Sequence, residues 1–212
     1  MRDCVFLVAD GTMATVFGSF LTRHDYHDRL GCRALNDFEA ARDILVHPRR
    51  DPGVYADAHE FLRDYRRLYQ RAVLALDAAW EGSPGVENIE QNISEQMRRT
   101  GWEAEAFAVI VIDPELENWI WQRKPYVAEV LRYRGDPPLW DWLDRSGHWP
   151  KEQPKPADPK GTVEHVLQYT RTPRSAALYR KIIARASVVG CADLSFKKLR
   201  QALGRWFPAE GA

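Results

Sequence analysis

Four short apolar runs along the chain alternate with segments whose apolar positions recur at helical spacing. The runs cover residues 4–9, 43–47, 71–76 and 107–112, and the last of them consists largely of β-branched side chains. Such runs, bounded by polar or Pro residues, predict strands that are buried on both faces. Helical spacing follows at residues 13–21, 56–69 and 83–99, and again after residue 113. The polar segment 22–40 predicts a long loop.

This alternation predicts the α/β class, with a mostly parallel sheet of about four strands and flanking helices. Ser83 and Pro84 are a favourable N-cap and first residue for the third helix. We expect residues 1–125 to form the α/β core and residues 126–161, rich in Pro and Trp, to be a connecting segment. Residues 162–212 should then be a basic helical extension packed on that core.

Composition limits the class of protein. The chain has 212 residues, 45% of them apolar, which is ample for one domain with an appendage. Positive and negative side chains are equal in number, so total charge identifies no partner. Cys4, Cys32 and Cys191 have no metal-binding spacing and are expected to be reduced thiols. No apolar stretch is long enough to cross a membrane, and we expect a cytoplasmic protein.

Acidic residues follow three of the predicted strands. Asp10, Asp77 and Asp113 should share one edge of a parallel sheet, where α/β proteins place their ligands. Glu81, Glu115 and Glu117 lie a few residues further on. Clustered carboxylates repel each other, and Mg²⁺ or Mn²⁺ would remove that repulsion. The alternative is structural, because Asp10 and Asp113 could cap the helices that follow them.

Residues 113–119 make a sharper prediction. On a helix that begins at Pro114, residues two apart point about 200° apart. Glu115 and Glu117 therefore cannot both face the site unless the chain there is irregular. We expect Glu117 to face Asp10 and Asp77, and Trp119 to pack inward.

The C-terminal part of the chain is basic. Its helices could hold the phosphates of a nucleic acid, or they could simply present a solvated face. The candidate nucleic-acid-binding residues are Arg174, Arg180, Lys181, Arg185, Lys197, Lys198 and Arg200.

The acids after the first and third strands, followed by Pro114-x-x-Glu117-x-Trp119, resemble the TOPRIM-like superfamily. The stretch 174–203, with Tyr179-Arg180-Lys181 and Phe196-x-x-Leu199, is similar to the tail of its RloB-like bacterial branch. The chain is also similar overall to a small component of the methylation-associated anti-phage defence system. This resemblance implies a TOPRIM-like fold, defence proteins as partners, and Asp10, Asp77 and Glu117 as metal-binding catalytic residues.

Two departures from the superfamily pattern bear on activity. Asp10 stands where those enzymes have Glu, and Asp77-Ala78-Ala79 replaces an Asp-x-Asp pair. Glu81 is the substitute ligand nearest in sequence. A site that has lost an acid binds Mg²⁺ less well.

Three functions remain open from the sequence. The first is a Mg²⁺- or Mn²⁺-dependent nuclease of a defence system, acting on DNA or RNA. The second is a catalytically degenerate subunit that binds partner proteins or nucleic acid, and an exposed apolar patch around Trp140, Trp142 and Trp149 would favour it. The third is a small-molecule or nucleotide binder at the same edge of the sheet.

Overall fold

A four-stranded parallel sheet forms the centre of the molecule. The computed structural model describes residues 1–187, 191 and 193–209. The strand order is β2-β1-β3-β4, and every neighbouring pair is parallel. The α/β class predicted from the sequence is therefore confirmed. The strands are β1 (Arg2–Val8), β2 (Ile44–Val46), β3 (Tyr69–Asp77) and β4 (Phe107–Ile112).

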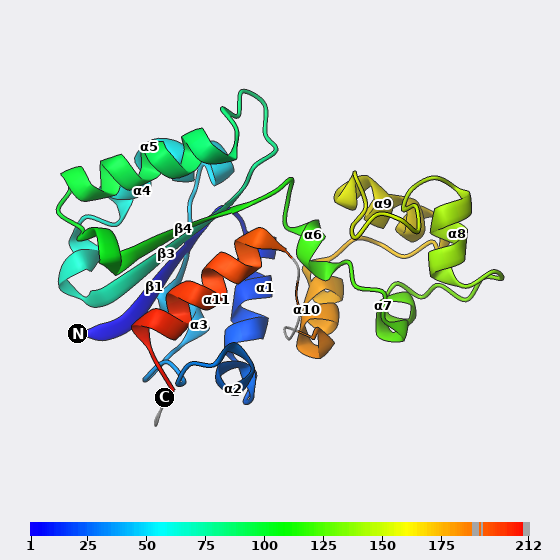
Figure 1. The fold of residues 1–212 in the computed structure, drawn as a ribbon, viewed down its shortest axis with the longest axis horizontal. Helices are drawn as coiled ribbons and strands as arrows, with labels where there is room; N and C mark the ends of the chain where they lie inside the picture. The colour runs from blue at the N-terminus through cyan, green and yellow to red at the C-terminus, as the bar shows by residue number, and fades with distance from the viewer. Residues whose placement is uncertain (188–190, 192, 210–212) are drawn as a thin grey trace.

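Helices cover both faces of this sheet, which explains why its strands are apolar throughout. On one face, α4 (Arg50–Phe61) packs on β1 and β3, and α5 (Val86–Arg99) packs on β4. On the other face, α1 (Gly11–Leu21) packs on β1 and β2, and α11 (Leu194–Trp206) packs on β4 (Figure 1). Between these layers Phe6, Leu7 and Leu74 have no exposed surface.

Shorter helical elements fill the connections. The segment 22–40, predicted as a loop, contains one helix and the start of another. The short elements of this core are α2 (Tyr26–Leu30), α3 (Ala40–Asp43), α6 (Glu117–Ile120) and the 3₁₀ turns η1 (Asp64–Arg67) and η2 (Ala104–Ala106).

Two predicted helix boundaries are wrong. The predicted helix 56–69 begins earlier, at Arg50, and Tyr69 at its expected end belongs to β3. Helix α5 begins at Val86 rather than near Ser83. Its N-cap is Gly85, in the left-handed region at φ 89°, because the Ser83 hydroxyl donates to Ala78 O at 2.6 Å and stabilises the preceding turn.

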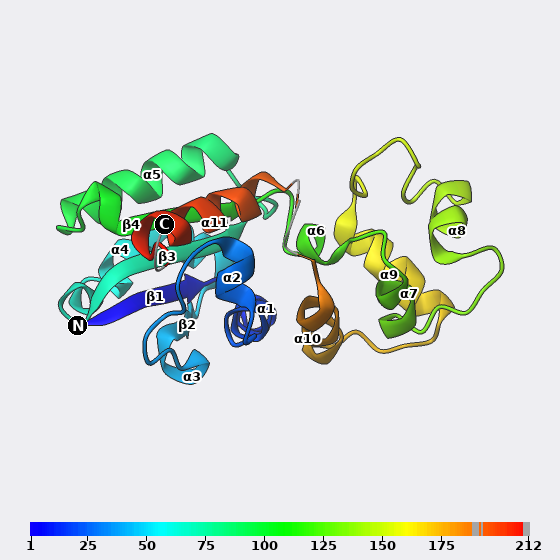
Figure 2. The ribbon, with the colours of Figure 1, turned by 60° about the horizontal axis from the view of Figure 1, so that its bottom comes forward.

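A smaller lobe lies beside the sheet, formed by the segment expected to be a connection together with the helix that follows it. It contains α7 (Pro125–Val130), α8 (Leu139–Arg145) and α9 (Pro159–Tyr169) (Figures 1 and 2). Its interior is aromatic: the Trp149 ring lies 5.6 Å from both Trp121 and Trp140. The chain then returns to the core through α10 (Ala176–Arg185), which packs on α1.

The tryptophans of this lobe do not form an exposed apolar patch. Trp149 is only 2% exposed, and Trp140 and Trp142 are partly buried against the other aromatic rings. The exposed patch that would have favoured a partner-binding subunit is therefore not found at these residues, whose side chains form the core of the smaller lobe.

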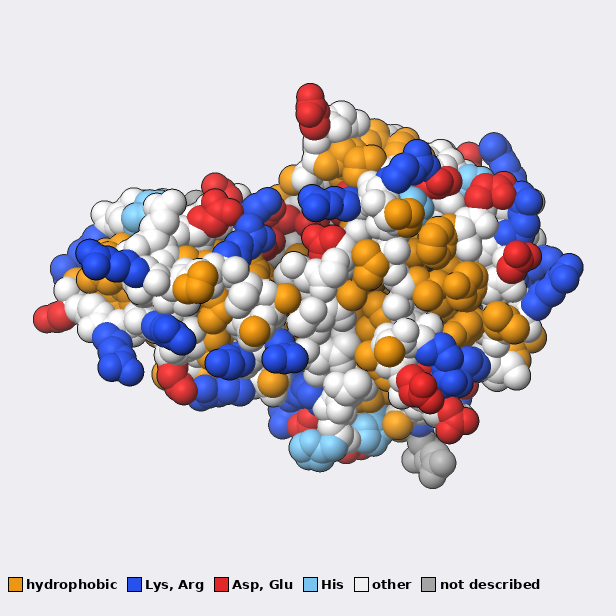
Figure 3. Space-filling view, turned by 180° about the vertical axis from the view of Figure 1, so that it is seen from behind, with side chains coloured by type: hydrophobic (Ala, Val, Ile, Leu, Met, Phe, Trp, Pro, Cys, Tyr) orange, Lys and Arg blue, Asp and Glu red, His pale blue; other side chains and the backbone are white. Residues whose placement is uncertain are grey.

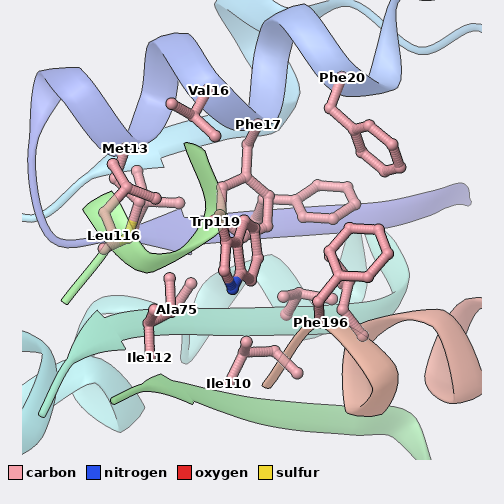
Figure 4. Packing of buried hydrophobic residues seen from close by; sticks show 14 of the residues in the cluster. Met13, Val16, Phe17, Phe20, Ala75, Ile110, Ile112, Leu116, Trp119 and Phe196 are labelled. Atoms are coloured by element: carbon pink, nitrogen blue, oxygen red, sulfur yellow. The ribbon is translucent and has the colours of Figure 1, made fainter. Parts of the chain in front are cut away.

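Asp193, at the start of α11, links that helix to the segment that follows β4. Its carboxylate caps α11 by accepting from Phe196 N at 3.0 Å, and it also accepts from Asn118 Nδ2 at 2.6 Å and Trp119 Nε1 at 3.1 Å. Trp119 packs inward as predicted, between Phe17 and Phe196, each 5.4 Å from its ring (Figure 4).

We expect Asp193→Ala to lower the free energy of unfolding by about 1–3 kcal/mol, because it removes a cap and a buried acceptor together. Urea denaturation measures the change. Ser175→Ala is the matched control, because Ser175 precedes α10 without a side-chain cap bond and its loss should cost less than about 0.5 kcal/mol. Equal effects of the two variants would contradict this role of Asp193.

Candidate functional site

Carboxylates from separate segments gather at the carboxyl edge of the sheet. Asp10 follows β1 and Asp77 ends β3, and these strands are neighbours. As predicted, the two acids lie at one edge, since the charge of Asp10 contributes to raising the pKa of Asp77. Figure 3 shows acidic side chains in the hollow between the core and the smaller lobe, with Lys and Arg side chains beside them.

Asp77 is at the centre of this group. Its backbone N–H donates to Asp51 Oδ1 at 2.8 Å, and its own Oδ1 accepts from Leu116 N at 2.9 Å. Burial raises the pKa of Asp77 to about 9, and the negative charges of Asp51, Glu117, Glu115 and Asp10 contribute to the increase. Asp77 therefore carries a proton at neutral pH.

Asp51 is a member of the group that the sequence analysis did not identify. It lies in the first turn of α4, and burial raises its pKa, with a smaller contribution from the charge of Asp10. Its signal in the sequence was its position soon after β2, a strand that is parallel to the others. The intervening His47-Pro48-Arg49-Arg50 separates it from the end of that strand, so a search for acids directly at strand ends missed it.

Asp10 and Asp113 differ in their structural roles. The Asp10 carboxylate accepts from Met13 N at 2.8 Å and so caps α1, as the structural alternative predicts. Asp113 caps no helix, because α6 begins only at Glu117 with Leu116 as its N-cap. The Asp113 side chain is exposed, and its backbone carbonyl accepts from Asn118 Nδ2 at 3.1 Å.

The segment between β4 and α6 is irregular and is bound to the end of β3. Ala78 N and Ala79 N both donate to Pro114 O, at 3.0 and 2.9 Å. Because this segment is not helical, Glu115 and Glu117 both come close enough to raise the pKa of Asp77. Glu115 Oε1 also accepts from Lys160 N, at the start of α9, at 3.0 Å.

Glu117 is buried, with 3% of its surface exposed. Its Oε1 accepts from Arg174 Nη2 at 2.5 Å and from the Tyr179 hydroxyl at 2.8 Å. Burial together with the Glu117 charge raises the pKa of Tyr179 well above its usual value. Arg174, predicted to bind nucleic acid, is therefore committed in this structure to Glu117 and, at 3.1 Å, to Glu164.

Glu81, the proposed substitute ligand, is exposed in the loop between β3 and α5. Within residues 1–187, 191 and 193–209, no group of three or more His, Cys, Asp or Glu side chains is arranged to hold a metal ion. The three cysteines are free, as predicted.

The other predicted basic residues lie on two helices, α10 and α11, that pack on different elements. On α11, Lys198 pairs with Glu90 at 2.6 Å and Arg200 donates to Leu30 O at 3.3 Å, whereas Lys197 is exposed. On α10, Arg180 and Lys181 are exposed. Arg185 of α10 pairs with Glu129 of α7 at 2.9 Å.

Comparison with protein-family models, with curated protein sequences and with solved structures finds no match to this chain. Among the described residues, no helix is both long enough and apolar enough to span a membrane.

The pKa of Asp77 predicts a pH dependence of stability. The unfolded chain loses this proton near pH 4 and the folded protein only near pH 9, so the folded state holds an extra proton between these values. Stability should fall as the pH rises through this range. Asp77→Asn keeps the acceptor for Leu116 N without the charge. It should raise the melting temperature at about pH 8 and flatten its decline with pH. Asp28→Asn, at an exposed carboxylate, is the control, and identical profiles for native protein and Asp77→Asn would contradict the assignment.

Removing the partner of a buried charge is costly. We expect Arg174→Ala to destabilise the protein by about 3 kcal/mol, the low end of the range for a broken buried pair, because the Arg174 side chain is partly exposed. Adding Glu117→Gln should recover part of this loss. Urea unfolding of the two single variants and the double variant gives the coupling energy, and simple additivity would contradict a direct pair.

Proposed function

We propose that the protein is a divalent-cation-dependent phosphoryl-transfer enzyme that acts on nucleic acid. The observation that supports this function is the convergence of Asp10, Asp51, Asp77, Glu115 and Glu117, from four connections, on the carboxyl edge of one parallel sheet. That edge is where α/β folds place their ligands.

The chemistry of the donors fits Mg²⁺ or Mn²⁺. Carboxylate oxygens are the ligands that these hard cations prefer. Asp10, Asp51 and Asp77 each use Oδ1 to accept a backbone N–H, which orients the carboxyl group and leaves Oδ2 for another ligand. Asp77 must release its proton before it can bind, and the cation would then offset the repulsion that raises its pKa. A bound cation would activate water and stabilise a leaving oxygen.

Basic side chains beside this edge would bind the substrate. Residues 122–187 contain thirteen Lys or Arg against seven Asp or Glu, whereas residues 1–121 contain thirteen against twenty-one. Arg174 lies where these two parts meet, and a guanidinium suits the bidentate binding of a phosphate. A substrate phosphate on Arg174 would have to share it with Glu117.

The TOPRIM-like resemblance agrees with this proposal and extends it. Within that pattern we assign the place of the missing second acid after the third strand to Asp51 rather than Glu81, because Asp51 contacts the backbone of Asp77. The same resemblance leads us to propose a component of a bacterial anti-phage defence system that works in the cytoplasm with other defence proteins.

A second candidate function is nucleic-acid binding without catalysis. It is favoured by the Glu117–Arg174 pair, which occupies a candidate metal ligand, and by the proton held on Asp77. In this case the acids of the carboxyl edge would be a structural remnant, and the basic side chains of the smaller lobe would bind the nucleic acid.

Cleavage assays distinguish the two functions. Purified full-length protein is incubated with labelled single-stranded and duplex DNA and RNA in Mn²⁺, Mg²⁺ or EDTA. We expect metal-dependent cleavage that Asp77→Asn and Asp51→Asn each reduce by more than the roughly 10–100-fold expected for loss of an outer-shell partner. Glu81→Gln, at an exposed acid of the same edge, should retain activity. Cation-independent binding of the substrate without cleavage in any of these conditions would favour the non-catalytic function.

A further inference from the structure

An exposed tyrosine ends the last helix of the smaller lobe. Tyr169 is 54% exposed, yet its ring is held in place by Trp142 at 4.9 Å and Tyr133 at 5.4 Å. These contacts support one side of the ring and leave much of it open to solvent. A fixed and exposed aromatic ring loses little conformational entropy when a flat ligand stacks on it.

Three arginines lie close in sequence to this pair of tyrosines. Arg132 and Arg134 flank Tyr133 in the chain, and Arg171 follows Tyr169 by two residues, so the Tyr133–Tyr169 contact joins the two segments that carry them. All three are exposed, and within the described part of the chain none forms an ion pair. Their guanidinium groups are available to an anionic ligand, unlike those of Arg174 and Arg185.

Two of these arginines occupy backbone positions that arginine rarely adopts. Arg132 follows the C-cap of α7 at φ 58°, and Arg171 follows the C-cap of α9 at φ 50°. Gly or Asn is preferred there, because a Cβ atom disfavours the left-handed conformation. Both helices therefore end on an unfavourable residue that places a cation beside the aromatic pair.

An open hollow lies beside Arg171 and Arg174. It has a volume of about 470 Å³ and is lined by α9 and the segment after it, including Gln168, Arg171, Arg174 and the acid Glu164, which pairs with Arg174. Of its lining residues, Arg174 contacts Glu117, whose charge acts on Asp77. Phosphates bound along Arg171 and Arg174 would therefore lead to the candidate site.

We propose that the ligand of this surface is single-stranded nucleic acid, with an unpaired base stacked on Tyr169 and neighbouring phosphates bound by Arg132, Arg134 and Arg171. This inference rests on the proposed function and names its substrate class. Single strands are bound through aromatic stacking and a positively charged groove, whereas a duplex keeps its bases stacked on each other and offers only phosphates to such a surface.

Fluorescence anisotropy in EDTA tests the proposal without cleavage. The probes are a labelled mixed-sequence oligonucleotide and its duplex. Stacking of one base predicts that Tyr169→Ala weakens single-strand binding by about 5- to 150-fold, whereas Tyr169→Phe, which keeps the ring, binds like the native protein. Duplex binding should be unchanged by Tyr169→Ala. Leu68→Ala, at a similarly exposed apolar residue of the sheet core, is the control.

The arginines have a separate signature. Each of Arg132→Ala, Arg134→Ala and Arg171→Ala should weaken binding of both probes and reduce the single-strand log–log salt slope by about 0.7. Circular dichroism and the melting temperature verify that each variant is folded. Equal single-strand affinity of Tyr169→Ala and native protein, or native preference for the duplex, would overturn the proposal.

This inference and the proposed function can fail separately. Tyr169-dependent single-strand binding without metal-dependent cleavage would refute the enzymatic proposal and leave the binding surface intact. Cleavage that depends on Asp77 but is unaffected by Tyr169→Ala would refute the surface and leave the enzyme intact.

Discussion

The buried carboxylate of Glu117 determines how the C-terminal half of the molecule sits on the sheet. An unpaired charge at this depth would be strongly unfavourable, and its compensation comes from Arg174 and Tyr179. Glu117 is where the chain leaves the core for the smaller lobe, and Arg174 lies where it returns. The ion pair therefore joins the two ends of the lobe at the carboxyl edge, together with the packing of α10 on α1, and places Arg174 beside the acids.

The sheet and part of its site could be predicted because they follow from local properties of the chain. An apolar, β-branched run such as residues 107–112 is most stable as a strand that is buried on both faces. Acids at the carboxyl ends of parallel strands then share one edge of the sheet. This logic placed Asp10 and Asp77 correctly. The TOPRIM-like assignment came from a few motif residues instead and remains a hypothesis.

What could not be predicted depends on contacts between distant segments. Asp51 joined the site because the first turn of α4 reaches the backbone of Asp77, which no spacing in the sequence reveals. The pairing of Arg174 with Glu117 could not be predicted either, because the two residues are far apart in the sequence. The burial of Trp140 against Trp149 could not be predicted, because a segment with many Pro residues has no helical periodicity to show that the lobe packs on itself.

The acids of the carboxyl edge are stabilised in two different ways, and this difference decides which of them a cation would bind first. Glu117 is paired with the guanidinium of Arg174, whereas Asp77 forms no ion pair with any described residue and its pKa is raised by burial and by the neighbouring acids. A divalent cation at Asp77 would displace a proton, which the solvent can take. A ligand at Glu117 would instead have to displace an arginine that holds the lobe in place. Asp10, Asp51 and Asp77 are therefore the positions that a cation can bind first, and Glu117 joins them only if a substrate phosphate draws Arg174 away. In the proposed enzyme, binding along the lobe and completion of the site would be coupled through that one residue.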